Sequence, residues 1–432
     1  MTTAILFGSF LLLLLIGVPI GVALGAASML AILYIPFLSL DMYALGLVSA
    51  IDSFTLIAVV LFTLAGSLMA EGGISKRLIA VADHAFGGMP GDLGTVTIMS
   101  CLFFAAISGT GSATVAAIGL AMIPALVDRG YDRAYAGAMV ASAGGLGVMI
   151  PPSVVMIVYA VSSGVSVTAL FMAGIVPGFV IALTLIGYNV IQRRSGNQGA
   201  GNPVPPTRTG SLWAALWDAK LALAMPPVVL GSIYSGMVTP TESSAVAVVY
   251  ALIVSCFVYR ELPLSAVPKM MLEAALLVSA VLVIIGASYA FGRIIALERI
   301  PSDLAQLVLS LTQSKVVVML AAIVLLLIVG TFLETLAAIV ILTPVLLPIM
   351  LKLGVDPVHF GIVMVVALAI GFVTPPLGAN LFMAAAVGKI RFEDIARRIF
   401  PWVVTMIFAL LLIAFIPVLS LGLPELFLGY GR

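Results

Sequence analysis

Apolar stretches of helical length follow one another along the whole chain, separated by short polar connections. A window of about 19 residues identifies twelve of them. They lie near residues 4–36, 44–70, 93–127, 134–162, 167–191, 213–236, 241–259, 267–297, 303–333, 335–351, 358–388 and 400–422. Because a helix satisfies its backbone hydrogen bonds internally, a series of apolar helices is stable in a bilayer. The pattern predicts an all-α, polytopic membrane protein.

The longest polar connection, residues 192–211, divides the chain almost in half. We therefore expect a first half at 1–191 and a second half at 212–432. Basic residues favour the cytoplasmic side of a membrane, and this connection carries Arg193, Arg194 and Arg208. It is predicted to be cytoplasmic, and a second basic cluster is expected on the same side, formed by Lys389, Arg391, Arg397 and Arg398.

The two halves repeat each other. With a shift of 224 residues, eight of 29 positions are identical without a gap, and most of them are Gly or Pro, the residues that dictate backbone shape. The identical pairs are Pro124 and Pro348, Gly130 and Gly354, Asp132 and Asp356, Gly137 and Gly361, Ala143 and Ala367, Gly147 and Gly371, Pro151 and Pro375, and Pro152 and Pro376. Such repeats are typical of secondary transporters that bind near the bilayer midplane.

Composition supports this class. Hydrophobic residues make up 63% of the 432 residues and charged residues 9%, whereas soluble domains are roughly 45 to 50% apolar. The Lys and Arg residues are scattered over short loops, which excludes a nucleic-acid-binding surface. Cys101 and Cys256 lie in apolar stretches and are expected to be buried small hydrophobes. The first apolar run has no Lys or Arg before it, which favours a retained span over a cleaved signal peptide.

The first polar centre is ISGTGSAT at 107–114, in the middle of the uncharged stretch 93–127. Each apolar arm beside it has about 15 residues and reaches about 22 Å, short of the roughly 30 Å hydrocarbon core. A hairpin that enters the bilayer and turns back fits these lengths better than one overlong span. Its tip would carry Ser108, Gly109, Thr110 and Ser112 near the midplane.

The second polar centre is GTFLETLA at 330–337, inside the stretch 316–351, where Glu334 is the only acid. A longer hairpin is expected here. An ionisable group in such a run is a functional hypothesis, because burying it unpaired costs several kcal/mol and a bound cation would offset that cost. The alternative is a protonated Glu334, or one that reaches out to water from a helix end.

A proline pair follows each hairpin, in GGLGVMIPPS at 144–153 and GFVTPPLGAN at 371–380. Pro151 with Pro152, and Pro375 with Pro376, predict broken helices near 134–162 and 358–388. The break frees carbonyl oxygens, which together with hydroxyl groups suit a small cation such as sodium, and the half-helix ends beside them can direct N–H groups at an anion. The alternative is that these prolines only kink two spans.

Other motifs have structural explanations. Thr239, Pro240 and Glu242 fit a capping box that starts a helix. His84 and His359 are expected near interfacial loops, and no second His or Cys stands at metal-ligand spacing, so no transition metal is predicted. Motifs for nucleophilic, ATP-driven or zinc chemistry are absent from the sequence. The sequence therefore predicts a carrier that uses an ion gradient, with no organic cofactor, and not an enzyme.

The motifs and their order resemble the large membrane subunit of the tripartite ATP-independent periplasmic (TRAP) transporters, the DctM type. The resemblance rests on segments that cover nearly the whole chain: GVPIGVALG, LAGSLMAEGGISKRLI, ISGTGSATVAAIG, IPALVDRGYDRAYAGAMVASAGGLGVMIPPS, YSGMVTPTESSAVAVVYAL, VGTFLETLAAIVILTPVLLPI and GVDPVHFGIVMVVALAIGFVTPPLGANLF. The length is similar to that of the large subunit alone, without the small subunit fused to its front.

This resemblance implies a sodium-coupled importer of an organic anion, such as a dicarboxylate, sugar acid or sialic acid, in the bacterial inner membrane. It implies two inverted repeats that form a scaffold and an elevator-like transport domain. The implied partners are a small four-helix membrane subunit and a periplasmic binding protein. One implied site combines Ser108, Gly109, Thr110 and Ser112 with Gly144, Gly147 and Ser153. The other combines Gly330, Glu334 and Thr335 with Thr374, Gly378 and Asn380, although the acid in this tip is more often Asp in the family.

Two other classes remain open from the residues alone. A channel-like permease, or another ion-coupled anion carrier, would work without a binding protein, and channel flux would persist with sodium removed from both sides. A membrane-embedded hydrolase would need a base or acid paired with Ser108 or Ser153, and His84 and His359 are poorly placed for that role.

Overall fold

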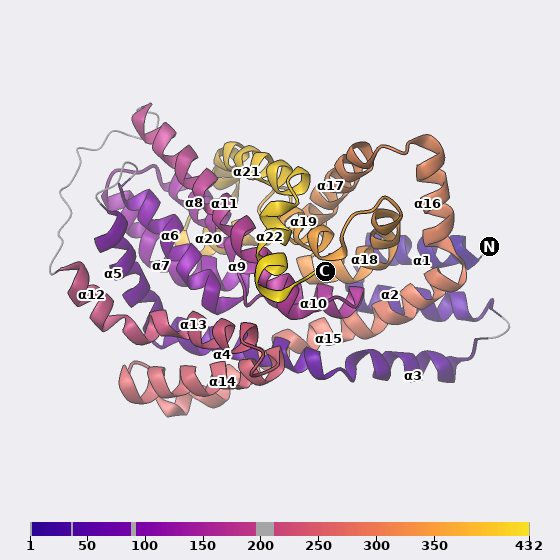
Figure 1. Ribbon diagram of the computed structural model, residues 1–432, viewed down its shortest axis with the longest axis horizontal. Coiled ribbons are helices and arrows are strands. Elements are labelled where there is room, and N and C mark those ends of the chain that lie inside the picture. Colours follow the sequence, from indigo (N-terminus) through magenta and orange to yellow (C-terminus); the bar gives the residue numbers. More distant parts are fainter. Residues whose placement is uncertain (1, 36–37, 88–91, 196–210, 432) are drawn as a thin grey trace.

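A computed structural model describes residues 2–35, 38–87, 92–195 and 211–431, and throughout these ranges the regular structure is helical (Figure 1). Eight of the described helices are long and apolar enough to cross a membrane, or up to ten if each of two bent pairs counts as one span. The all-α, multi-span prediction is confirmed. Most of the polar connection, residues 196–210, lies outside the described residues.

Among its described residues the first half contains eleven α-helices. Their bounds are α1 Thr2–Leu15, α2 Ile20–Ile32, α3 Leu40–Ile51, α4 Phe54–Glu71, α5 Ile74–Phe86, α6 Asp92–Ser108, α7 Gly111–Asp128, α8 Arg133–Gly144, α9 Leu146–Met149, α10 Val154–Ser163 and α11 Val167–Arg194.

In the second half, residues 211–431 form another eleven α-helices, a π-helical turn and a 3₁₀ turn. Their bounds are α12 Leu212–Asp218, α13 Lys220–Tyr234, α14 Pro240–Leu252, η1 Ile253–Val258, η2 Leu264–Ala266, α15 Val267–Leu297, α16 Ile300–Leu311, α17 Lys315–Phe332, α18 Thr335–Lys352, α19 Pro357–Gly371, α20 Ala379–Gly388, α21 Phe392–Phe415 and α22 Val418–Leu428.

The internal repeat extends well beyond the 29 positions that reveal it in the sequence. Adding 224 to the bounds of α7 gives the bounds of α18, and the same shift brings α6 to within one residue of α17 and α10 to within one residue of α20. It also places α8 on α19 and α11 on α21. Both proline pairs are joined by cis peptide bonds. The repeated helices therefore follow the same order in both halves, although α15 is continuous where α3 and α4 are separate.

Packing between the halves is reciprocal. Helix α4 packs against α14, and the corresponding pair in the exchanged halves, α15 and α2, also packs together. In the same way α7 contacts α20 while α18 contacts α10. Exchange of the halves thus maps one set of contacts onto the other, as a pseudo-two-fold axis between repeats requires.

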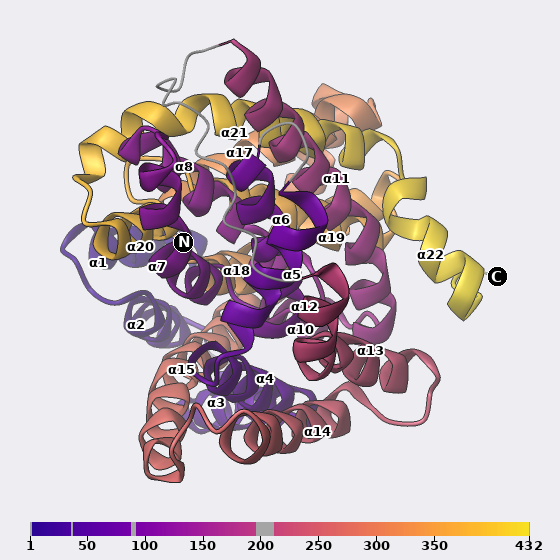
Figure 2. The same cartoon turned by 90° about the vertical axis from the view of Figure 1, so that its left-hand side faces the viewer.

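The helices form layers around the two hairpins. Helices α3, α4, α14 and α15 run along one edge of the molecule and α8, α11 and α21 along the other, with α7, α10 and α18 between them (Figures 1 and 2). Helices α1 and α2 pack against α15 in a separate hydrophobic cluster, which is not part of the main core. The hairpins and broken helices therefore pack mostly in the main core.

Five stretches that look continuous in hydropathy are broken in the structure, among them 213–236, which divides between α12 and α13, and 400–422, which divides between α21 and α22. The stretch 4–36 divides between α1 and α2, where Gly17 adopts a φ of +84° and Pro19 precedes the second helix. The stretch 44–70 divides at Asp52 and Ser53, and the stretch 303–333 divides between α16 and α17. A hydropathy window averages over such turns, because two or three residues of positive φ or β conformation hardly change its mean.

The capping box predicted before α14 is confirmed. The Thr239 side chain accepts from the Glu242 amide at 3.2 Å, and the Glu242 carboxylate accepts from the Thr239 amide at 2.7 Å, with Pro240 in the first turn. These bonds satisfy two of the free donors at the helix start. Glu242 therefore has a structural role at the start of an apolar helix.

Arg193 of the first basic cluster and the second basic cluster lie on one face, as predicted, while Arg208 lies outside the described residues. The Arg193 guanidinium stands 4.7 Å from the ring centre of Tyr131, and Arg398 Nε lies 3.7 Å from the Asp132 carboxylate next along the chain. A surface cavity beside Asp132 carries the rest of the second cluster, Lys389, Arg391 and Arg397. We call this surface the basic face.

Candidate functional site

The first tip is a small cluster of hydroxyl groups between α6 and α7, which pack against each other. Ser108 Oγ lies 2.8 Å from Thr114 Oγ1, and the Thr114 hydroxyl donates to the Thr110 carbonyl at 2.9 Å. Ser108 and Thr114 are buried. The tip therefore concentrates oxygen atoms without any ionised group.

Gly109 makes the turn at this tip. Its φ is +64°, a conformation that residues with a side chain rarely adopt, and a Cβ there would come within 2.8 Å of the Pro152 carbonyl oxygen. The Gly109 carbonyl accepts from the Val154 amide at 3.3 Å, at the first residue of α10. The hairpin turn is therefore bonded directly to the broken helix.

The first broken helix bends by 44° between its halves, α8 with α9 and α10. Gly147 faces the tip so closely that a Cβ would collide with the Thr110 carbonyl, and one at Gly144 would collide with Val115. Ser153 caps α10: its side chain accepts from the Met156 amide at 3.3 Å and donates to the Val148 carbonyl at 2.7 Å. Ser153 thus holds the break open, and its hydroxyl is already bonded on both sides.

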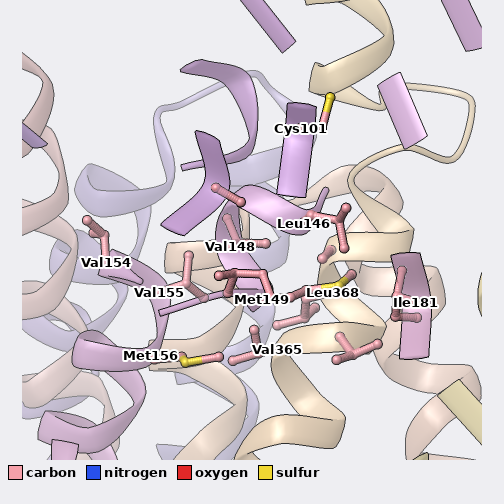
Figure 3. Close-up of a cluster of buried hydrophobic side chains, with 14 of the residues drawn as sticks. Cys101, Leu146, Val148, Met149, Val154, Val155, Met156, Ile181, Val365 and Leu368 are labelled. Atoms are coloured by element: carbon pink, nitrogen blue, oxygen red, sulfur yellow. The ribbon is translucent and has the colours of Figure 1, made fainter. Parts of the chain in front are cut away.

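Apolar side chains surround this break. Figure 3 shows Leu146, Val148 and Met149 of the short helix α9 beside Val365 and Leu368 of α19. Cys101 lies in the same cluster, fully buried and without a disulfide partner, as predicted. Cys256 is also a free thiol, although it is only partly buried. The break is therefore surrounded mainly by apolar side chains, and Ile150 and Pro151 also line a separate apolar cavity of about 250 Å³.

The second tip joins α17 to α18 through Leu333 and Glu334. Gly330 packs on Gly371 of the second broken helix, where a Cβ on Gly371 would come within 2.6 Å of the Gly330 backbone. Thr335 is 3% exposed, and its hydroxyl has no hydrogen-bond partner among the described residues. This buried hydroxyl is consistent with a ligand at the tip, since buried polar groups are normally bonded.

A single cavity of about 460 Å³ joins the two tips. It is lined by Ser108, Thr110 and Ser112 of the first tip and by Glu334 and Thr335 of the second. The volume is within the roughly 300 to 1,000 Å³ of small-molecule sites. The two sites that the sequence predicts separately thus share one chamber.

Sequence reasoning missed the opposite wall of this chamber, which comes from α4 and α15. Thr63 and Ser67 of α4 and Glu273 of α15 line the cavity. Glu273 also forms an i,i+4 ion pair with Lys269 at 3.7 Å. The sequence could have indicated Glu273 as a candidate site residue, because it lies in an apolar stretch just as Glu334 does.

Several residues assigned to the second site lie elsewhere. Asn380 is buried beside the first repeat: its amide donates to the Ala141 carbonyl at 3.5 Å, and it lies next to Gly111. The Thr374 hydroxyl donates to the Ile370 carbonyl within its own half, at 2.7 Å. Gly378, just before α20, packs on Leu381. Asn380 thus joins the first tip because α20 packs on α7 and α8.

Both positive and negative ends of helix dipoles lie at the chamber. Helices α7 and α18 begin at the tips, and neither Thr110 nor Glu334 caps its helix through the side chain. Their first-turn N–H groups lack intrahelical acceptors and favour an anion. Helices α6 and α17 end at the same tips, so their carbonyl ends favour a cation. The chamber can therefore hold an anion beside a small cation.

The residues present fit sodium better than a transition metal. Hydroxyl and carbonyl oxygens of Ser108, Thr110 and Thr114 and the Glu334 carboxylate are hard donors. Within the described ranges, no group of three or more His, Cys, Asp or Glu could hold a metal.

His359, expected near an interfacial loop, is instead buried in α19, where its ring nitrogens contact Ser420 Oγ at 2.6 Å and the Ala414 carbonyl at 3.1 Å. Packing of α22 on α19 covers it.

Fold and chamber together define a multi-pass membrane transporter built from two repeats. The model of the tripartite ATP-independent periplasmic transporter family, DctM component, matches residues 7–419, and the chain belongs to this family. Its members are transporter subunits and not enzymes.

Curated relatives agree. The chain is 46% identical to the isethionate TRAP transporter permease protein DctMQ of Oleidesulfovibrio alaskensis, over 98% of this chain and 66% of that protein. It is 35% identical to the C4-dicarboxylate TRAP transporter large permease protein DctM of Rhodobacter capsulatus, over 99% of both. It is also 35% identical to the sialic acid TRAP transporter large permease protein SiaM of Vibrio cholerae, over 97% of this chain and 98% of that one.

A solved structure shares the fold. The YdaH transporter of Alcanivorax borkumensis, whose crystal structure is described as having an unusual topology, superimposes with a TM-score of 0.65 at 17% identity, over 98% of both chains. At this identity the similarity shows the fold alone.

Proposed function

We propose that this chain is the membrane-embedded transport subunit of a sodium-coupled importer of an organic anion. The observation that carries the proposal is the shared chamber, where two uncapped helix starts and an oxygen-rich, acid-containing wall face the same space. The helix starts would hold the carboxylate or sulfonate group, and the oxygen atoms would hold sodium.

Glu334 supports cation coupling in particular. A carboxylate in the chamber repels an anionic substrate unless a cation offsets its charge. Sodium near Glu334 would therefore strengthen substrate binding, and substrate would strengthen sodium binding by the same factor. Such reciprocity is the thermodynamic basis of symport.

The two walls of the chamber come from different sets of helices, which is consistent with an elevator movement of one set against the other. One wall consists of the hairpin tips, and the other consists of α4 and α15, whose partners are α14 and α2. Gly66 of α4 lies against the Ser108 backbone, where a Cβ would come within 2.9 Å of the carbonyl oxygen. We propose that the tips and broken helices slide as a unit along α4 and α15, where Gly66 allows the Ser108 backbone to approach closely.

The family assignment supports the partners that we propose. The subunit would act in the bacterial inner membrane with a small four-helix membrane subunit and a periplasmic binding protein that delivers the anion. The DctMQ relative is longer than this chain, which spans 66% of it. The relatives are named for isethionate, C4-dicarboxylates and sialic acid. All three are organic anions, so the substrate class is proposed and the individual substrate is left to experiment.

Uptake by proteoliposomes tests the proposal. The chain is reconstituted with its small subunit, a binding protein and succinate or isethionate, and an inward sodium gradient is imposed. We expect saturable uptake that stops when sodium is absent from both sides. Flux that continues without sodium would support the channel-like alternative, and uptake by the large subunit alone would contradict the tripartite mechanism.

A further inference from the structure

A second, separate cavity lies beyond the chamber along the same two helices. It has a volume of about 370 Å³. The chamber uses Val281 of α15 and Leu336 of α18, while the second cavity uses Ile285 and Val340, one helical turn farther on each helix. Helices α3 and α10 complete its wall. We call it the outer cavity.

A cationic side chain borders the outer cavity. Arg293 of α15 lines it with an exposed side chain, which also borders a small cavity against α2 and α3, and this arginine is the only charged residue between Glu273 and Glu298 in the sequence. Within the described residues Arg293 forms no ion pair. Ionisable residues on spanning helices commonly mark the path of a substrate or ion. The chamber carries acidic groups, whereas the outer cavity carries a basic one.

A second polar group in this cavity has no partner. Ser288 is 3% exposed, and its hydroxyl makes no hydrogen bond to any described residue. It lies on α15 about one turn from Arg293, and both line the same space. An unpaired buried hydroxyl costs free energy that a ligand oxygen would recover.

The outer cavity lies away from the basic face. The chain leaves that face at Asp132, passes through α8 and α10 to Ser162, and returns along α11 to Arg193 at the basic face. Ser162 lines the outer cavity, so the cavity is toward the opposite side of the protein. Gly292 approaches Pro344 of α18 to 3.8 Å from its Cβ position. Pro344 is ten residues beyond Glu334, or about 15 Å along the helix.

We propose that Arg293 and Ser288 form an outer anion site, which takes the carboxylate or sulfonate group of the substrate before it reaches the two tips. A guanidinium binds such groups through two parallel hydrogen bonds, and the Ser288 hydroxyl adds a third donor. The inference rests on the proposed function for its substrate class. The site lies between α15 and α18, so movement of α18 past α15 would separate Arg293 from the anion and release it inward.

Transport kinetics give the first test. Arg293→Gln should raise the KM for succinate or isethionate about tenfold or more and leave the maximal rate within about twofold. Arg293→Lys should recover part of the affinity, and Ser288→Ala should raise KM about threefold. Arg194→Gln, which removes one charge at the basic face, is the matched control and should transport as the wild type does.

A labelling test does not depend on transport. In a chain with Cys101→Ala and Cys256→Ala, Ser162→Cys places a thiol in the outer cavity. An uncharged maleimide should label it in detergent, and millimolar isethionate should slow the labelling when Arg293 is present but not in the Arg293→Gln chain.

The two tests separate the possible failures. Equal protection with and without Arg293, or an unchanged KM in folded Arg293→Gln and Ser288→Ala chains, would overturn the outer anion site. Arg293 would then only anchor the end of α15 in the headgroup region. Arginine-dependent protection in a chain that shows no sodium-driven uptake would support the site and contradict the proposed function.

Discussion

The two hairpin tips follow the same backbone path but carry different chemistry. At the shift of 224 residues, Thr110 corresponds to Glu334 and Gly111 to Thr335, and both Thr110 and Glu334 precede the first turn of a helix. The first tip is a neutral cluster of bonded hydroxyl groups. The second has one carboxylate and one buried hydroxyl without a described partner. The repeat therefore preserves the shape of the tips but not their charge.

The arms of the two hairpins differ as well. Helices α6 and α7 pack on each other, whereas α17 packs chiefly on α19 and α18 on α10. The arms of the first hairpin therefore pack on each other as well as on the broken helices, whereas the arms of the second pack mainly on the broken helices. We propose a division of roles, in which the first tip supplies a neutral wall and the second supplies a charge that responds to ions.

The largest expected effect tests that charge. Glu334→Gln should reduce sodium-driven uptake to background, because a neutral amide no longer offsets the charge of a bound cation, while Glu334→Asp should retain part of it. Glu242→Gln is the matched control: it should lower the melting temperature slightly and leave uptake intact. Wild-type sodium dependence in Glu334→Gln would remove the distinction between the tips.

The next effect tests the shape that the tips share. Gly147→Ala and Gly371→Ala each place a methyl group against tip or hairpin backbone, so each should lower uptake on the order of 100-fold by displacing the tip. Gly187→Ala, where nothing lies within 4 Å, should be neutral. Uptake assays with size-exclusion profiles measure both. If only one of the two glycines is sensitive, the halves do not share this requirement.

A smaller effect probes the neutral tip. Ser108→Ala removes one oxygen from the hydroxyl cluster and should weaken the apparent affinity for sodium about tenfold. Ser28→Ala on α2 is the control, since it removes a buried serine hydroxyl outside the chamber, one that donates to the Leu24 carbonyl. Sodium titrations of initial uptake rates measure the change. An unaltered sodium affinity would assign the cation to the second tip alone.

The smallest expected effect concerns Glu261, an acidic residue outside the spanning helices, as a comparison with Glu334 at the tip. The hydrogen bond from Arg77 lowers the pKa of Glu261, outside the spanning helices, below its ordinary value of 4.5. Its contribution is therefore fully present above that value and is lost as the pH falls through the lowered pKa. Glu261→Gln should lower the free energy of unfolding by at most about 1 kcal/mol, because the ion pair with Arg77 is partly exposed. Its melting temperature should also change less with pH between pH 5 and about 3 than that of the wild type.

Uptake near pH 7 should be unchanged in Glu261→Gln. A strong loss of uptake without a loss of stability would show that acids outside the tips also take part in transport.

The sequence alone was sufficient for features that depend on neighbours along the chain. Gly and Pro dictate local backbone, so the proline pairs, the glycine turn at Gly109 and the shift of 224 residues could be read directly. Hydropathy indicated helices in a bilayer, and the spacing of Thr239, Pro240 and Glu242 indicated a helix start. Short turns, such as the one at Gly17, were concealed because the hydropathy window averages over them.

Only the tertiary structure decided which distant residues meet. It merged the two tips into one chamber, placed Asn380 beside the first tip and Glu273 opposite both, and left Ser153 as a helix cap. No periodicity encodes these positions, because they follow from reciprocal packing of α7 on α20 and of α18 on α10 between halves far apart in sequence. Helix pairing of this kind depends on side-chain shape across an interface, whereas sequence patterns report which face of a helix is apolar and where its backbone turns.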